Sequence, residues 1–175
     1  MAGELMLILP KKYFEKERSG GYFVEITPDG DEIYHKNGLV ANGASWFLRT
    51  VFRGEAVLPA NYFLGLSSVT GTFDGATLAA MAAGEPVGNG YARQQLTKNT
   101  VDWSVAEANG AMQAQSKIVT FTATALWTQN WQYMFIADVA AGAGNLVSIS
   151  GPAPSPRVVN NGQGPSCRYE YWLRG

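Results

Sequence analysis

The stretch GEPVGNGYARQQLT, residues 84–97, has the spacing closest to that of a nucleotide-binding loop. A dinucleotide fingerprint needs G-x-G-x-x-G between a strand and a helix, and a P-loop needs G-x-x-x-x-G-K-[ST], because the backbone amides of these loops hold phosphate. Gly88 and Gly90 supply the first two glycines, but the third glycine and the Lys-Ser/Thr pair are missing and strand-like residues follow. The sequence therefore predicts a turn that leads into a strand, and no cofactor.

The other groups that could do chemistry are too few or too scattered. One histidine, His35, and one cysteine, Cys167, can form neither an internal disulfide nor a His/Cys metal cluster. A serine nucleophile would need a base and a G-x-S-x-G turn, and Cys167 is expected to be a small buried or edge side chain. No pattern brings together carboxylates such as Asp74, Glu107 and Asp138. We predict a protein without catalytic residues or a metal site.

The composition restricts the partners of the chain. With 13 Lys+Arg against 14 Asp+Glu, the formal charge of −1 provides no field that would attract nucleic acid or an anionic membrane. The apolar run at residues 5–9 is too short to cross a membrane and lacks the basic start and cleavage site of a signal peptide. We expect no nucleic-acid or membrane partner, and contacts made through shape and apolar surface.

Alternation with a period of two predicts mainly β structure from residue 61 onward. In KIVTFTATALW, Val119, Phe121 and Trp127 fall on one face and the threonines on the other. Many short strands between Gly, Pro, Asn and Ser clusters favour an antiparallel β-sandwich of jelly-roll type. Further strands are expected at residues 91–97, 101–105, 132–137, 145–150 and 168–173.

Two helices are expected beside the strands. An amphipathic helix over about residues 43–53 should be capped by Asn42 and end at Gly54. A short alanine-rich helix is expected at about residues 76–83. The stripe of the first helix that should pack into the core consists of Phe47, Leu48, Val51 and Phe52.

The chain is expected to divide into an N-terminal arm with a β-hairpin, residues 1–36, and a β-sandwich domain, residues 37–175. An apolar arm can dock on a neighbouring subunit as an added strand, although residues 5–9 could instead form an edge strand of the chain's own sandwich. The residues predicted to take part in subunit docking are Leu5, Met6, Leu7, Ile8 and Leu9 of the arm, Arg93 and Gln95 of the strand 91–97, and Pro154 and Pro156 of the loop 151–166.

Aromatic side chains gather in the stretch LWTQNWQYMF. The favoured interpretation places Trp127, Tyr133 and Phe135 in the sandwich core. The alternative is that Trp127, Trp131 and Tyr133 form an exposed platform on which a glycan stacks.

The order of these motifs resembles that of small structural proteins of tailed bacteriophages. NGLVANGASWFL is followed by GYARQQLT, by an alternating strand that ends in ALW, by MFIADVAAGAGNLVSIS and by VVNNGQGPSCRYEYWL. The resemblance covers roughly residues 37–173 and is to β-sandwich modules described as head-decoration (cement), head-fibre or tail-fibre-associated proteins. The leader 1–36 and the stretch YFLGLSS depart from that pattern, which leaves the attachment site open.

The resemblance implies a non-enzymatic virion protein that is assembled in the host cytoplasm. A capsid decoration protein would bind across junctions of the major capsid protein and stabilise the head. The alternative is a tail, collar or head-fibre component with a glycan- or receptor-binding sandwich. In both cases the partners would be other virion proteins and copies of the chain itself, in a homo-oligomer.

Overall fold

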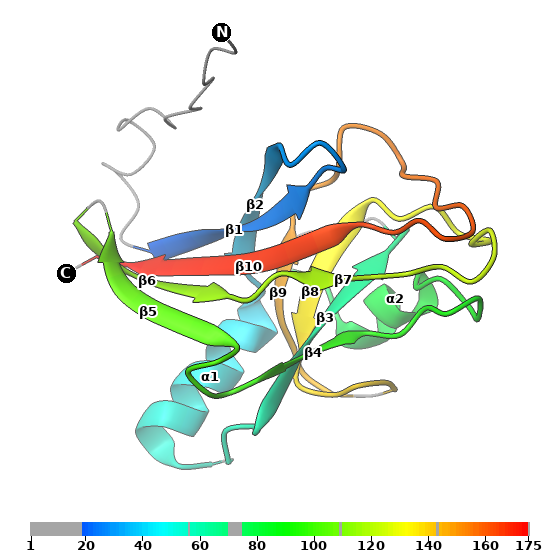
Figure 1. Cartoon of the computed structure of the whole chain (residues 1–175). Coiled ribbons are helices and arrows are strands. Elements are labelled where there is room, and N and C mark those ends of the chain that lie inside the picture. Colours follow the sequence, from blue (N-terminus) through cyan, green and yellow to red (C-terminus); the bar gives the residue numbers. More distant parts are fainter. Residues whose placement is uncertain (1–18, 56, 70–74, 109, 143, 175) are drawn as a thin grey trace, which may run out of the picture.

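The computed structural model describes residues 19–55, 57–69, 75–108, 110–142 and 144–174. These residues form two helices and one ten-stranded sheet in which every pairing is antiparallel (Figure 1). The strands are β1 (Ser19–Ile26), β2 (Glu32–Leu39), β3 (Asn61–Ser67), β4 (Gln94–Thr97), β5 (Trp103–Ala108), β6 (Ala111–Ser116), β7 (Val119–Thr120), β8 (Tyr133–Ala137), β9 (Leu146–Ser150) and β10 (Ser166–Leu173). The helices are α1 (Ala41–Arg53) and α2 (Leu78–Ala83).

The sheet is nearly closed on itself. Its strand order is β4-β3-β8-β9-β2-β1-β10-β6-β5, with β7 paired to β10 beside β6. Trp103 of β5, at one end of this order, meets the ring of Tyr62 of β3 near the other end, edge to face at 6.2 Å between centroids. The same indole meets Tyr169 of β10 at 6.3 Å. The mainly antiparallel, sandwich-like fold expected from the alternation is therefore confirmed.

Two apolar clusters lie on opposite faces of β8, which is buried at all five positions. Met134 and Ile136 face the main core inside the curved sheet. Phe135 and its alternate neighbours face a second cluster, which Met81 of α2 covers. Burial on both faces explains why YMFIA is apolar at every position rather than alternating.

The predicted hairpin is confirmed, and it lies within the sheet. β1 pairs with β2 on one side and with β10 along its whole length on the other, from Ser19 opposite Leu173 to Ile26 opposite Ser166. β2 in turn pairs with β9. Residues 5–9 of the arm lie outside the described residues.

The expected strand over residues 117–127 is too long. Only β7 joins a ladder there, because the amides of Phe121 and Ala123 donate instead to the carbonyls of Pro165 and Gln163 in an irregular connection. The alternation itself holds, since Phe121, Ala123 and Trp127 are buried.

Two further differences concern α1 and β6. Helix α1 starts at Ala41 after the N-cap residue Val40, which makes no side-chain capping hydrogen bond, so the predicted cap at Asn42 is wrong; Gly54 ends the helix as expected. The sequence did not predict β6, because AMQAQS is largely polar. The alanine-rich helix is confirmed as α2, and the Thr77 hydroxyl accepts a hydrogen bond from the amide of Ala80 at its start.

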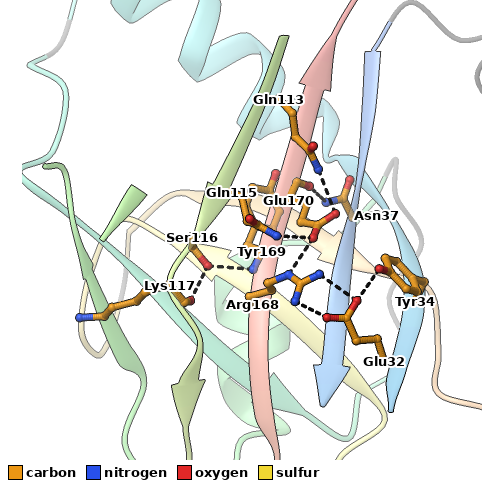
Figure 2. Close-up of polar contacts among 10 residues, drawn as sticks. All are labelled: Glu32, Tyr34, Asn37, Gln113, Gln115, Ser116, Lys117, Arg168, Tyr169 and Glu170. Atoms are coloured by element: carbon orange, nitrogen blue, oxygen red, sulfur yellow. Dashed lines mark hydrogen bonds and ion pairs between the residues drawn. The ribbon is translucent and has the colours of Figure 1, made fainter. Parts of the chain in front are cut away.

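A polar network links β2, β10 and β6, and its side chains reach across β1, which lies between β2 and β10 (Figure 2). The carboxylate of Glu170, which is 5% exposed, accepts hydrogen bonds from Arg168 at 2.7 Å, Gln115 at 2.8 Å and Gln113 at 3.1 Å. Arg168 also forms a two-point ion pair with Glu32, and its hydrogen bonds hold the pKa of Glu32 below the ordinary value. Every carboxylate in the network is bound within the chain, so its role is to fix the strand register.

Candidate docking surface

Helix α1 rests on β9 through small residues. Gly43 and Thr50 are its buried positions. A Cβ atom on Gly43 would lie 2.4 Å from the carbonyl oxygen of Val147, so only glycine allows this close approach. Thr50 keeps its hydroxyl within the helix by donating to the carbonyl of Trp46. The side of α1 that meets the sheet is therefore small and partly polar.

The apolar side of α1 faces solvent. The exposed fractions are 39% for Phe47, 53% for Leu48, 46% for Val51 and 78% for Phe52. These four residues, here called the outer stripe, were expected to pack into the core, and that prediction is wrong. The reason is the phase of the helix: Gly43 and Thr50 take the inner face because the β9 backbone comes too close for larger side chains.

A groove of about 450 Å³ runs along the opposite flank of α1. It lies between α1, the start of α2 and the residues that lead into β9, and its lining includes Trp46, Arg49, Thr77 and Asn145. Arg49 forms an ion pair with Glu55 at the rim. The groove is mixed in character, whereas the outer stripe is apolar.

Arg93 lies inside the subunit. It is 7% exposed, and its guanidinium donates to both carboxylate oxygens of Glu85 at 2.8 and 2.9 Å and to the carbonyl of Val139 at 3.0 Å. It also lies 5.2 Å from the centre of the Phe135 ring. These contacts fasten the segment before β4 to β8 and leave Arg93 little surface for docking.

The other docking candidates among the described residues face solvent. Gln95 is exposed on β4, at one end of the sheet, and donates to Asn61 and Thr97. Pro154 and Pro156 are exposed in the connection between β9 and β10. Ala153 and Val159 anchor that connection in the main core, so the two prolines project from a fixed segment.

The aromatic side chains of LWTQNWQYMF are buried in the two apolar clusters. Trp127, Trp131 and Tyr133 are 2%, 1% and 6% exposed, and the Trp127 indole donates to the carbonyl of Asn89. The prediction that Trp127, Tyr133 and Phe135 are buried is confirmed, although only Trp127 lies in the main core, and Tyr133 and Phe135 lie in the second cluster. Burial leaves the rings of Trp127, Trp131 and Tyr133 no exposed face on which a glycan could stack.

The GNG stretch is a turn, as predicted. Gly88, Asn89 and Gly90 have φ angles of 68°, 51° and 81°. Tyr91 follows, and its ring stacks on Phe121 at 5.8 Å between centroids. The turn thus brings the chain to the core before β4.

The remaining reactive groups are buried in ion pairs or apolar surroundings. Cys167 is fully buried, and burial raises the pKa of its thiol. Burial tends to raise the pKa of Glu25, but hydrogen bonds and charges from His35 and Arg157 outweigh it and lower the pKa. Among the described residues, no three His, Cys, Asp or Glu side chains could hold a metal ion together, and no helix is long and apolar enough to cross a membrane.

The described structure thus combines a mainly β framework with a helix whose apolar side faces solvent, and exposed apolar patches of this kind mark sites of contact with other molecules. A model of the family described as podophage GP4 fiber I protein gp80 matches residues 42–169, from the first turn of α1 into β10. The chain belongs to this family of tailed-phage structural fibre proteins, and the resemblance to tailed-phage structural proteins is confirmed. The protein is therefore a virion structural component. No curated protein matches the chain.

Sequence reasoning found the residues of the outer stripe but not their role. The spacing of the apolar residues predicts an amphipathic helix but does not show which side of that helix faces the sheet. One signal in the sequence could have shown which side of the helix faces the sheet. Gly43 and Thr50 are seven residues apart, about two helical turns, so they lie on the same side of the helix. Two small residues on one side allow that side to approach a backbone closely.

Proposed function

We propose that the protein is a component of a phage fibre that joins the virion through a protein contact made by the outer stripe of α1. The observation that carries the proposal is the stripe itself: four large apolar side chains face solvent on a helix that lies within the matched stretch. An amphipathic helix that presents its apolar side outward is a common way to dock into a partner's groove. The function is structural, and no enzymatic step is assigned to it.

A fibre component is favoured over a capsid decoration protein. The family description names a fibre protein, which agrees with the alternative drawn from the sequence. A decoration protein bound across junctions of the major capsid protein could use the same stripe, so the copy number per particle separates the two. The glycan-binding part of the alternative is not retained, because its three rings are buried.

The stripe can supply a useful but limited free energy. Full burial of one large apolar side chain contributes about 1.5–3 kcal/mol, whereas association costs about 4–15 kcal/mol in lost translational and rotational freedom. Because the four side chains are already partly buried, the stripe offsets only part of this cost. Further contact area or several linked attachment points are therefore needed for a stable fibre.

The test compares particles that carry stripe and control variants. The stripe variant is Leu48→Gln with Phe52→Gln; the control is Val101→Gln with Val105→Gln, two exposed valines outside α1. Quantitative mass spectrometry of purified particles should show the full chain and the control in few copies per particle, and the stripe variant depleted at least tenfold. Full incorporation of the stripe variant would reject the proposal, and hundreds of copies per particle would make the protein a decoration protein.

A further inference from the structure

The N-terminal arm precedes β1, which lies next to the strand that leads into α1. The β1–β2 ladder ends where Gly21 lies opposite Asn37, and β2 continues to Leu39 paired with β9. Leu39 is followed by Val40 and then by α1. The chain therefore enters the described sheet on β1, one strand away from β2, which leads into α1.

The outer stripe faces the side on which the arm begins. The stripe lies to one side of the buried line through Gly43 and Thr50, and Trp46 and Arg49 lie on the other, in the groove that borders α2. β9, on which α1 rests, has β8 on one side and β2 on the other. The groove borders α2 and the residues that lead into β9, so the stripe faces the other flank of α1, on the β2 side of β9.

The size of the stripe argues against a simple pairing of two helices. A helix of 13 residues is about 20 Å long and about 10 Å wide. Two such helices face to face bury far less than the roughly 800 Å² per partner of a stable interface. An occupant that brings further apolar surface is required.

The chain itself carries such a surface in Leu5, Met6, Leu7, Ile8 and Leu9. Residues 10–18 connect this run to β1, and nine residues span at most about 30 Å. This reach exceeds the length of α1, so the run can pass the end of its own helix and meet the helix of a neighbour.

We infer that the outer stripe binds residues 5–9 of a second copy of this chain. In a symmetric dimer, the arm of each copy binds the outer stripe of the other copy. The same contact therefore forms twice, and the buried area is twice that of a single contact. The inference rests on the proposed function and names the partner of the stripe. It also makes the apolar run and the stripe, which lie at two separate places in the chain, the two halves of one interface.

A photo-crosslinking experiment on the full chain tests this pairing. Benzoylphenylalanine is placed at Phe52, or at the exposed Val105 as the control, and chains labelled with 14N and 15N are mixed before irradiation. Peptide mass spectrometry should find position 52 linked to residues 5–9, with mixed-isotope pairs prominent, and position 105 without such links. Light scattering should give at least twice the monomer mass for the full chain and the monomer mass for Leu7→Gln with Leu9→Gln.

The other outcomes overturn the inference. Pairs of one isotope alone would mean that the arm covers its own helix, and links to another part of the chain, or none, would mean that the arm is not the occupant. If the Phe52 crosslink fails while the stripe variant is still depleted from particles, the stripe binds another virion protein and the proposed function stands. If the stripe variant joins particles normally, the proposed function fails independently of the arm.

Discussion

Gly90 and Gly30 have similar backbones and different surroundings. Their φ angles are 81° and 88°, but a Cβ atom on Gly90 would lie 2.7 Å from the carbonyl oxygen of Thr122, while one on Gly30 would meet nothing within 4 Å. Gly30→Ala should therefore lower the free energy of unfolding by about 1–2 kcal/mol, the cost of left-handed backbone. Gly90→Ala should lower it further, which urea denaturation can measure. Equal losses at the two positions would show that the contact with Thr122 is unimportant.

Asp102 fixes the corner between β4 and β5. Its carboxylate is 5% exposed, accepts a hydrogen bond from the amide of Thr97 at 2.7 Å and forms an ion pair with Lys117 at 2.8 Å. Asp102→Asn weakens the ion pair and should reduce the free energy of unfolding at pH 7 by about 1–3 kcal/mol. The exposed Glu107→Gln serves as the control and should stay within about 0.5 kcal/mol.

The same carboxylate should make stability depend on pH. The hydrogen bond from Lys117 holds the pKa of Asp102 below its ordinary value of about 4. A lowered folded pKa gives a stabilisation that is complete above the unfolded pKa and is lost as pH falls through the folded one. Unfolding free energies at pH 7 and pH 3 should therefore differ less in Asp102→Asn than in the natural chain. An unchanged difference would assign the acid sensitivity to other groups, such as Glu25 and Glu32.

Residues whose conformation is decided locally were predictable. Gly88 and Gly90 form the expected turn because glycine adopts positive φ at little cost. The partner of Arg93 was not predictable in this way. Glu85 and Val139 meet it only after β4 and β8 have taken their places in the sheet, so the sequence offered docking as an equally good role.

At the scale of the element, the two helices should respond differently to substitution. Leu48→Gln with Phe52→Gln in α1 should change the free energy of unfolding of the monomer by less than about 1 kcal/mol, because both side chains face solvent. Met81→Ala in α2 should cost about 2–5 kcal/mol, because Met81 is fully buried in the second cluster. Urea titration at low protein concentration measures both. A loss of several kcal/mol in the free energy of unfolding of the α1 variant would indicate that the stripe is buried in the core.

Helix α1 also shows what an element's sequence can and cannot reveal. The spacing of its apolar residues predicted a helix with an apolar stripe, and Gly54 predicted where the helix ends. Both features depend only on residues close together in the sequence. The side of α1 that meets the sheet depends on how closely the β9 backbone approaches the helix. Gly43 allows this approach because it has no side chain. The segment 117–127 is a second example. Its alternation of apolar and polar residues could be recognised in the sequence, but the carbonyls of Pro165 and Gln163 accept hydrogen bonds from amides that would pair with another strand in a regular ladder.

At the scale of the whole molecule, the alternation of apolar and polar residues was enough to predict a mainly β fold. The order of the strands in the sheet depends on pairings between segments that are far apart in the sequence. Phe23 of β1 packs against Tyr169 of β10 at 4.9 Å between ring centres, although the two residues lie near opposite ends of the chain. Such a pairing has no local sequence signal. It makes the hairpin a central part of the sheet, between β9 and β10.

The place of β1 leads to a prediction about truncation. Removal of residues 2–18 leaves every described strand intact, so the shortened chain should unfold in one cooperative transition like the full chain. Removal of residues 2–27 deletes β1 and leaves β2 and β10 each without a partner along one edge. It also removes Phe23 and Val24, which are fully buried. The second truncation should abolish cooperative unfolding in thermal circular dichroism, because the loss of two buried side chains and two ladders exceeds the roughly 5–15 kcal/mol that stabilise a typical domain. If this chain melts as sharply as the one that lacks residues 2–18, the hairpin is dispensable and the remaining strands form a domain on their own.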